Sequence, residues 1–316
     1  MKDRYPWLSM QRICEQYGKS RQAYYEWQRR LISIEKEEAE ILHHTRAFKT
    51  LLAKSGGRKL KSYLKEKGLG IGRDRLFDLL RAHGLLVRRR RKYARSTDSK
   101  HSLKVYPDLA KGLEIRQAER LLVSDITYVH TMEGFSYLHL VADAYSKKIM
   151  GGYLSRDLSA QASQKALEQA LNNRIYNHQC IHHSDRGIQY CSQAYIKQLE
   201  KHRIQISMTQ SGSPYDNAIA ERIIGILKEE FNLDHEFSSH VQAQKAVTQA
   251  LYLYNHRRPH LSCGYLTPEK AHEQGQGLEN KWKPKKLATY LQKQEKNQKK
   301  KNTNNNYNYS NKINEG

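Results

Sequence analysis

Cysteine is scarce in this sequence, and its few cysteines lie far apart. The four thiols form no Cys-x-x-Cys pair; they are Cys14, Cys180, Cys191 and Cys263. This spacing argues against a zinc knuckle and against a disulfide framework. We therefore expect reduced thiols, as in a cytoplasm, and no structural zinc.

Long apolar runs are also absent. No stretch approaches the roughly 20 apolar residues that a membrane-spanning helix needs. The first 18 residues, MKDRYPWLSMQRICEQYG, are polar and lack the apolar region of a secretory signal. These absences exclude an integral membrane protein and favour a cytoplasmic protein without a membrane partner.

Acidic residues are the minority among the charged ones. The 316 residues include 55 Lys and Arg against 32 Asp and Glu, which gives a net charge of +23. A chain with this excess is suited to bind a polyanion, with nucleic acid as the first candidate and an acidic membrane surface as the second. Residues 120–230 are nearly balanced, with 12 basic and 11 acidic residues. The sequence therefore predicts a neutral core between basic arms.

The N-terminal arm, residues 1–86, has the pattern of two successive helix-turn-helix units. In the first, Ser9 and Ser20 are placed to cap two helices, over 9–18 and 20–30. In the second, glycines between 68 and 72 separate two basic helices with leucines at helical spacing, which are Leu60, Leu64, Leu76, Leu79 and Leu80. An ordinary helical hairpin is the alternative for either unit. We expect at least one unit to contact DNA, with Arg73 and Arg75 among the contacting residues.

Two further basic segments flank the neutral core. Residues 87–118 read as a basic linker that begins with a run of arginines, Arg88, Arg89, Arg90 and Arg91. We expect these four side chains to contact DNA phosphates without reading sequence. Residues 274–316 form a basic and then Asn/Tyr-rich tail that we expect to be largely disordered. A solvated, solubilising run is the alternative for both segments.

The middle of the chain has the periodicity of alternating strands and helices. A three-stranded antiparallel meander is predicted over 121–130, 136–145 and 147–155. A helix, a strand, a helix, a strand and a helix follow over 159–175, 179–184, 193–202, 204–210 and 216–231. This order predicts an α/β sandwich within residues 119–273.

Three carboxylates in this core are candidate metal ligands. Asp125 lies in the middle of an apolar strand, where an ionised carboxylate is unfavourable unless something compensates its charge. Asp185 follows the short strand 179–184, and Glu221 lies on the helix 216–231. A metal ion would compensate Asp125. The alternatives are the solvent face of an edge strand for Asp125, a turn for Asp185 and a solvated helix position for Glu221.

Helix geometry places Glu221 beside two other polar side chains. At 100° per residue, Glu221 lies about 200° from Ile219, which belongs to the apolar stripe that must face the core. Asn217 and Lys228 share the face of Glu221. A carboxylate beside a cation suits a phosphate, so we expect Asn217 and Lys228 to contact DNA. A solvated lysine or a surface ion pair is the alternative for Lys228.

Four segments of the chain resemble one known family. The sequence resembles bacterial insertion-sequence transposases with a retroviral-integrase-like core, of the type encoded by a second reading frame. The segments that carry the resemblance are SDITYV, HSDRGIQY, SPYDNAIAERIIGILKEE and YNHRRPHLSCGYLTPEKA. Asp185 and Glu221 are separated by 35 residues, the interval by which this Asp-Asp-Glu family is usually described.

The resemblance implies a fold, a catalytic site and partners. The implied fold is a ribonuclease H-like integrase core, a mixed five-stranded sheet with helices, preceded by all-α helix-turn-helix units. Asp125, Asp185 and Glu221 would be the catalytic triad and would hold two Mg²⁺ ions, with Mn²⁺ as a substitute, for strand cleavage and strand transfer. Asp143 matches a family position outside the triad. The implied partners are terminal inverted repeats, target DNA, further copies of the chain and a protein of the element's first reading frame.

The family pattern is not matched everywhere, and two other functions stay open. Leu122 stands where a tryptophan often precedes the first Asp, and GGRKL replaces a more usual Gly-Tyr-Arg-Arg-Ile. A nuclease of the same fold would share the triad but would not need two DNA-reading units. A DNA-binding regulator would keep the arms and tolerate the loss of a carboxylate. Strand transfer on a terminal-repeat substrate separates the three functions.

Overall fold

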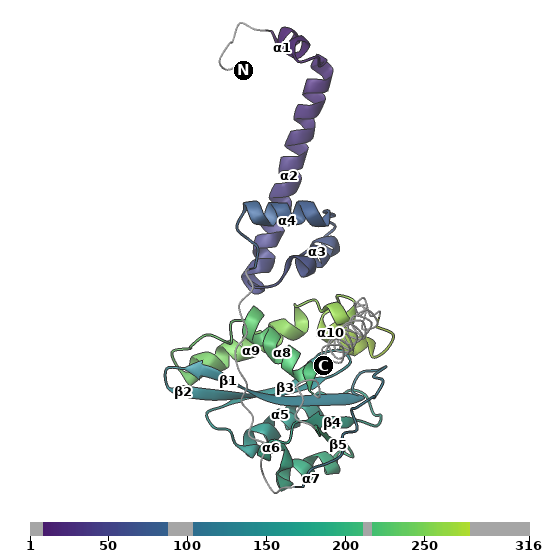
Figure 1. Ribbon diagram of the computed structural model, residues 1–316, viewed down its shortest axis with the longest axis vertical. Helices are drawn as coiled ribbons and strands as arrows, with labels where there is room; N and C mark the ends of the chain where they lie inside the picture. The colour runs from purple at the N-terminus through teal and green to yellow at the C-terminus, as the bar shows by residue number, and fades with distance from the viewer. Residues whose placement is uncertain (1–8, 88–103, 211–216, 279–316) are drawn as a thin grey trace, which may run out of the picture.

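The computed structural model describes residues 9–87, 104–210 and 217–278 of the chain. Figure 1 shows two parts, a helical unit reached by one long helix and an α/β body with helices on both sides of a sheet. The predictions for the arginines at 88–91 and for the tail beyond residue 278 lie outside the described residues.

The helical unit begins with two serine-capped helices. Ser9 caps α1 (Met10–Gln16) and Ser20 caps α2 (Arg21–Leu51), because each hydroxyl accepts a backbone N–H three residues ahead. The predicted starts are confirmed, but the predicted end of the second helix near residue 30 is wrong. No glycine or proline interrupts residues 21–51, and Ile41 and Phe48 in the second half of the helix are buried against the two helices that follow, so the helix continues for 31 residues.

The second predicted helix-turn-helix unit is a packed hairpin on the far half of α2. Its helices are α3 (Gly57–Glu66) and α4 (Arg73–Ala82). Gly68 follows α3 with a φ of 80°, a left-handed conformation that favours glycine. The five predicted leucines are buried in one cluster with Ile41, Leu42 and Phe48 of α2, with Leu52 just after it, and with Ile71. The hairpin is therefore held by apolar packing against α2.

The body contains a five-stranded mixed sheet with the order β3-β2-β1-β4-β5. Its antiparallel meander consists of β1 (Leu121–Thr131), β2 (Gly134–Asp143) and β3 (Ile149–Ser155). On the other side of β1 lie two parallel strands, β4 (Ile181–Ser184) and β5 (Gln205–Met208). The predicted α/β fold with a mixed sheet is confirmed, and β1 is its central strand.

Helices cover both faces of this sheet (Figure 1). One face carries α5 (Ala160–Asn172), α6 (Ile188–Cys191) and α7 (Gln193–Lys201). The other carries α8 (Ala218–Glu230), α9 (His240–His256) and α10 (Pro268–Gln274), with a short 3-10 helix (Leu261–Cys263) between the last two. A separate buried apolar cluster fills each interface.

Part of the region predicted as a linker packs on this body. The backbone N–H of Leu109 donates to Ser207 on β5, and Gln117 forms a β-bridge with Gln276. Residues 104–118 therefore belong structurally to the body, which begins earlier in the chain than the predicted boundary at residue 119. In the ranges that the structure describes, no helix is both long enough and apolar enough to cross a membrane.

Candidate active site

Two of the three candidate carboxylates lie side by side, Asp125 within β1 and Asp185 just after the adjacent parallel strand β4. Val123 of β1 pairs in register with His183 of β4. Two residues beyond this pair, β1 continues to Asp125 and β4 has just ended before Asp185. Glu221 lies in the first turn of α8, which packs against β1. The fold thus places on neighbouring elements residues that are 60 and 36 positions apart in the sequence.

The electrostatics of Asp125 show that these charges act on one another. Burial raises the pKa of Asp125 to about 7, the charge of Asp185 is the next cause, and Glu221 adds to the effect. The backbone N–H of Ile126 and the charge of Lys228 act in the opposite direction. Carboxylates that repel one another in a partly buried position are unfavourable without a cation, which is the electrostatic condition of a metal site.

The side chains of Asp125, Asp185 and Glu221 do not converge on one point in this structure. Among the described residues, no group of three or more His, Cys, Asp or Glu side chains is arranged to hold a metal ion. Asp125 Oδ1 accepts the N–H of Ile126 at 2.8 Å, Asp185 Oδ1 accepts the N–H of Gly187 at 2.9 Å, and Glu221 is exposed. All-oxygen donors still suit a hard cation such as Mg²⁺. Metal binding would therefore require these side chains to turn toward one another.

A buried histidine holds the strands beneath the carboxylates. His182 Nε2 lies 2.6 Å from Ser124 Oγ and 2.9 Å from Tyr195 Oη. Burial lowers the pKa of His182 to about 3, so the ring is neutral near pH 7, and its Nε2 is hydrogen-bonded within this group of hydroxyls. His182 therefore fixes β1 next to Asp125 and takes no proton from a substrate.

Asn217 connects the helix of Glu221 to the strand of Asp125. Its Nδ2 donates to the backbone carbonyl of Ser124 at 2.9 Å. The side chain is only 8% exposed, and its buried Oδ1 has no hydrogen-bond partner among the described residues. The residue that we predicted to contact DNA thus faces the protein in this structure, where it positions the start of α8.

Lys228 lies beside Asp125 as well as along the helix from Glu221. Its Nζ is 4.0 Å from the centre of the Tyr128 ring on β1, a cation–π contact. Burial lowers the pKa of Lys228, while the charges of Asp234 and Asp125 act to raise it. The amine is therefore held close to the carboxylates, and its contact with DNA stays a prediction.

Comparison with known proteins places this site in a family. Models of the integrase core domain match residues 116–214 and 202–268. The chain is 33% identical over 273 residues to the Insertion element IS600 uncharacterized 31 kDa protein of Shigella sonnei, covering 83% of this chain and 99% of that protein. It is 30% identical over 269 residues to Transposase InsF for insertion sequence IS3A of Escherichia coli (strain K12), covering 83% and 93%. The chain belongs to the insertion-sequence transposases with an integrase core.

The matched regions of the transposase include all three candidate carboxylates. Asp125 and Asp185 fall within residues 116–214, and Glu221 within residues 202–268. Among solved structures, the HTLV-2 integrase catalytic core domain with magnesium in its trimeric form aligns with a TM-score of 0.40 and 18% identity, over 49% of this chain and 96% of that chain. A chain of the simian T-cell lymphotropic virus intasome with PP2A regulatory subunit B56 gamma aligns with a TM-score of 0.43 and 16% identity, over 72% and 74%.

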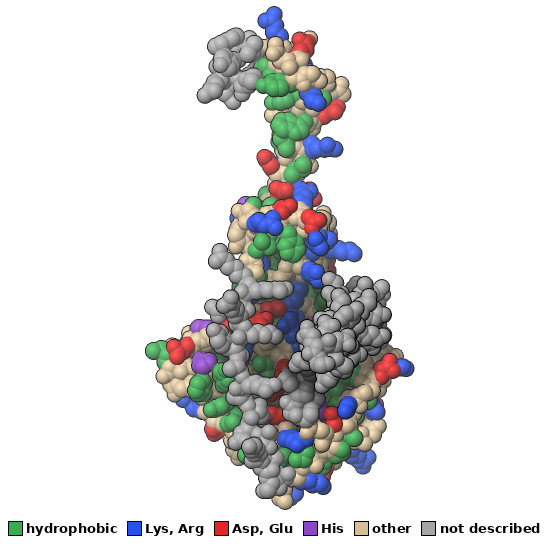
Figure 2. Space-filling view, viewed as in Figure 1, with side chains coloured by type: hydrophobic (Ala, Val, Ile, Leu, Met, Phe, Trp, Pro, Cys, Tyr) green, Lys and Arg blue, Asp and Glu red, His purple; other side chains and the backbone are tan. Residues whose placement is uncertain are grey.

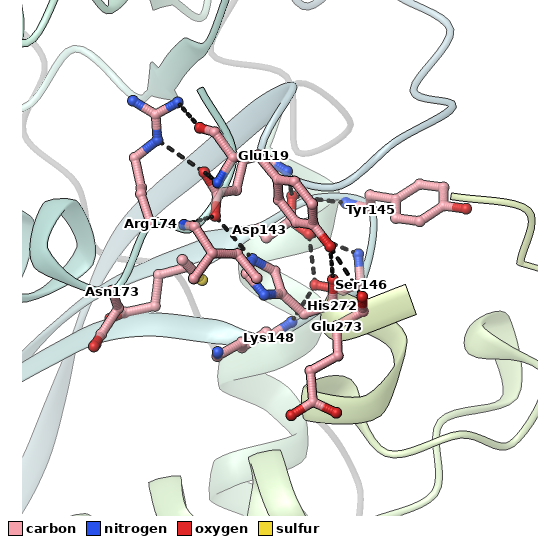
Figure 3. A network of polar contacts seen from close by, with 12 residues as sticks. Glu119, Asp143, Tyr145, Ser146, Lys148, Asn173, Arg174, His272 and Glu273 are labelled. Atoms are coloured by element: carbon pink, nitrogen blue, oxygen red, sulfur yellow. Dashed lines mark hydrogen bonds and ion pairs between the residues drawn. The ribbon is translucent and has the colours of Figure 1, made fainter. Parts of the chain in front are cut away.

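Asp143, which also matches a family position, lies away from the site and has a structural role. Its buried Oδ1 accepts the N–H of Glu119 at 2.9 Å, and its Oδ2 accepts the N–H of Ser146 at 2.9 Å (Figure 3). These bonds close the turn from β2 to β3 and join it to the start of β1. Because both oxygens of Asp143 are engaged in this way, it has no position among the candidate ligands.

Sequence reasoning missed Glu119, the centre of the same network. Glu119 is fully buried, and it accepts Arg174 Nε at 2.9 Å and the N–H of Ile175 at 2.8 Å. His272 Nε2 lies 3.2 Å from Glu119 Oε1 (Figure 3). Burial acts to raise the pKa of Glu119, but these contacts hold it below the usual value. Glu119 thereby joins the start of β1 to α10. Its only sequence signal is an acidic residue just before an apolar strand.

The predicted DNA-contacting arginines of α4 lie in the helical unit, away from the carboxylates. Arg73 forms an exposed ion pair with Asp74 at 2.9 Å. Arg75 lies 3.2 Å from both Glu37 and Glu38 of α2. Both arginines remain partly or largely exposed. Because exposed ion pairs contribute little to stability, DNA phosphates can replace the acidic partners of these arginines at low cost.

Proposed function

We propose that this transposase binds the terminal inverted repeats of its element and uses Asp125, Asp185 and Glu221 to hold two Mg²⁺ ions for strand cleavage and strand transfer. Polynucleotidyl transfer is the chemistry of the family. The observation that carries the proposal is the parallel pairing of β1 with β4, which sets Asp125 beside Asp185 just after the end of β4. In keeping with this placement, burial and the charge of Asp185 raise the pKa of Asp125 to about 7. A pair of divalent ions would remove this repulsion and take the oxygen donors that the three residues offer.

The chain's own residues would prepare the site for these ions. Asp125, Asp185 and Glu221 would hold the ions, which would supply activation of the attacking oxygen and stabilisation of the leaving oxygen of the scissile phosphate. Strand pairing fixes Asp125 next to Asp185, His182 holds Ser124 in place, and α8 supplies Glu221. No histidine is needed as a general base in this scheme. Mn²⁺, which has similar coordination preferences, would substitute for Mg²⁺.

We assign the parts of the chain to steps of the reaction. Residues 1–86 would bind the element's ends, with Arg73 and Arg75 on the exposed side of α4, and residues 119–273 would carry out the chemistry. The linker 87–118 would add phosphate contacts through its arginines at 88–91, and residues 274–316 would form a basic tail. Lys228, and Asn217 if its side chain turns outward on binding, would contact the DNA backbone next to the scissile phosphate.

The proposed partners follow from the reaction. Two element ends must be joined to target DNA, and each chain contributes one proposed catalytic site. We therefore propose that the transposase acts as a homo-oligomer on DNA, with one copy for each end. We also propose the protein of the element's first reading frame as a partner. The substrate lies in the bacterial cytoplasm, so we place the protein there, at the nucleoid when it is bound to DNA.

Charge-removing substitutions at constant volume test the proposal. Asp125→Asn, Asp185→Asn and Glu221→Gln should each abolish cleavage and joining of terminal-repeat DNA in Mg²⁺ while binding of that DNA is unchanged. Glu229→Gln is the matched control, because Glu229 is an exposed carboxylate on the same helix. Near wild-type joining by any of the three variants would remove that residue from the site. Cleavage without joining by the wild type would favour a nuclease, and binding alone would favour a regulator.

A further inference from the structure

The helical unit packs directly against the catalytic body. Phe231, just after α8, and Leu253 of α9 pack against the buried cluster formed by α2, α3 and α4. Figure 1 shows this unit next to α8 and α9, at the face of the body that these two helices cover. The two parts therefore share an apolar contact at the end of α8.

An ion cluster lies at the centre of this junction. Glu230, the last residue of α8, accepts Arg258 Nε at 2.9 Å and Arg258 Nη2 at 2.8 Å. Lys59 Nζ of α3 donates to the same carboxylate at 2.5 Å and 2.8 Å. Lys and Arg side chains also gather at the waist between the two parts in Figure 2. One carboxylate thus joins a residue of the helical unit to the segment that follows α9.

The cluster is largely removed from water. The side chains of Lys59, Glu230 and Arg258 are 15%, 12% and 2% exposed. Burial lowers the pKa of Lys59 to about 8, with Arg258 as the second cause. Burial acts to raise the pKa of Glu230, but Arg258 and Lys59 hold it below its usual value. Such a buried ion cluster adds little net stability to the fold. It favours one arrangement of α3 against α8, because moving Lys59 away from Glu230 would leave a buried charge without its pair.

The same helix carries the candidate metal ligand and this cluster. Glu221 and Glu230 are nine residues apart on α8, about 14 Å at 1.5 Å per residue. A helix of this length is rigid on that scale, and Asn217 fixes its other end to β1. A displacement of α3 relative to α8 would therefore change the path of bound DNA relative to Glu221.

We propose that Glu230, Lys59 and Arg258 form a positioning device that fixes the helical unit on α8, so that DNA held by this unit presents one phosphate to Asp125, Asp185 and Glu221. This inference rests on the proposed function and adds a determinant of where the element's end is cut. Lys59 is a positioning residue, since it acts through α8 and touches neither metal nor scissile phosphate.

The position of cleavage on end-labelled terminal-repeat DNA tests the proposal. Lys59→Met removes the charge and keeps the length of the side chain; Glu66→Gln, which removes an exposed acidic charge from the same helix, is the control. The wild type and Glu66→Gln should cut at one phosphate. Lys59→Met should spread the cuts over neighbouring phosphates and lower cleavage at the original one by about tenfold or more, as expected for a small misplacement. Lys59→Arg should restore the original position.

A merely structural role for Lys59 would lower the amount of active protein without moving the cut. Unchanged cleavage position and rate in Lys59→Met would overturn the proposal. Failure of the wild type to cleave would instead refute the proposed function. In that case the geometry of the junction between the helical unit and the body can be measured without DNA, from the distance between two spin labels. Spin labels at Lys65→Cys on α3 and Gln249→Cys on α9 are suitable, because the four native cysteines are buried.

The spin-label distances give a second, independent result. The doubly labelled protein should show one narrow distance distribution, and the addition of Lys59→Met should broaden or displace it. The addition of Glu66→Gln should leave the distribution unchanged. An equally narrow, unshifted distribution in Lys59→Met would show that the ion cluster does not fix the helical unit, and would overturn the proposal whatever the activity of the protein.

Discussion

The repulsion among the candidate ligands should be measurable as a stability effect in the metal-free transposase. The pKa of Asp125 is about 7 in the folded protein, against an ordinary value of 3.8 that applies to the unfolded chain. Between these values the folded state binds more protons than the unfolded state, so stability falls as the pH rises through this window. The stability lost through ionisation of Asp125 reaches its full value above pH 7 and disappears as the pH falls toward 4. Asp125→Asn removes the charge and should therefore stabilise the metal-free protein.

The magnitude follows from the size of the shift. A shift of about 3 units at 1.36 kcal/mol per unit sets a ceiling of about 4 kcal/mol. Asp125 is partly exposed, and Asp185 and Glu221 can move apart, so water and relaxation reduce the effect to about 1–3 kcal/mol. The stability advantage of Asp125→Asn over the wild type should be about 1–2 kcal/mol larger at pH 8 than at pH 5.

Urea unfolding of both proteins at pH 5 and pH 8, in the presence of a chelator, measures this difference. Comparison of the variant with the wild type at each pH cancels the other titrating groups. Addition of Mg²⁺ should then stabilise the wild type and leave Asp125→Asn nearly unchanged, because bound ions stabilise the state that holds them. Parallel pH dependences of the two proteins would refute the reasoning, since they would mean that Asp125 does not experience the charges of its neighbours.

Three further predictions concern single contacts. Lys228→Met should raise the pKa of Asp125, because the lysine charge lowers it, and should move the acidic limb of the cleavage pH profile to higher pH; an unmoved limb would contradict the placement of Lys228. Glu119→Gln should lower the free energy of unfolding by about 3 kcal/mol while the cleavage position stays the same, because Arg174 would lose its buried partner. Alanine at all four arginines of 88–91 should weaken binding to specific and random DNA alike. The slope of log binding constant against log salt concentration should become shallower by roughly 0.9 for each lost phosphate contact, for up to four contacts; an unchanged slope would indicate solvated arginines.

Local features of the fold were predictable from the sequence because local physics decides them. Ser9 and Ser20 cap helices where the pattern placed them, since a cap needs only a hydroxyl before a helical segment. The leucines of α3 and α4 are buried at the expected spacing. The end of α2 was not predictable in this way, because its continuation past residue 30 depends on packing of Ile41 and Phe48 against α3 and α4.

Helix α9 was not predicted from the sequence, for a related reason. It buries Ala243, Val247, Ala250 and Tyr254 on one side, a stripe of mostly small residues with little contrast to its polar neighbours. Only the sheet and the other helices on the same face show which surface α9 covers. Its end leads to Arg258, which lies within a segment that carries the family resemblance but whose sequence position alone indicates no role.

In the candidate site, the sequence predicted which elements carry the three carboxylates but not how their neighbours are arranged. Asp125 and Asp185 could be placed on and after apolar strands and Glu221 on a helix from the residue pattern, and the resemblance joined the three as a predicted triad. The burial of Asn217 was not predictable, because helix periodicity gives the angle of a side chain but not the position of the strand it reaches. Glu230 and Lys59 meet across 171 positions of the chain, so no local pattern could join them.

Anomalous diffraction from crystals of the transposase with terminal-repeat DNA and Mn²⁺ would show whether Asp125, Asp185 and Glu221 together hold divalent metal. Two anomalous peaks should appear roughly 3.5–4 Å apart, beside the scissile phosphate and in contact with oxygens of all three carboxylates. Peaks elsewhere, or an ordered DNA-bound site in which Glu221 stays more than about 10 Å from both aspartates, would contradict this role for the three carboxylates.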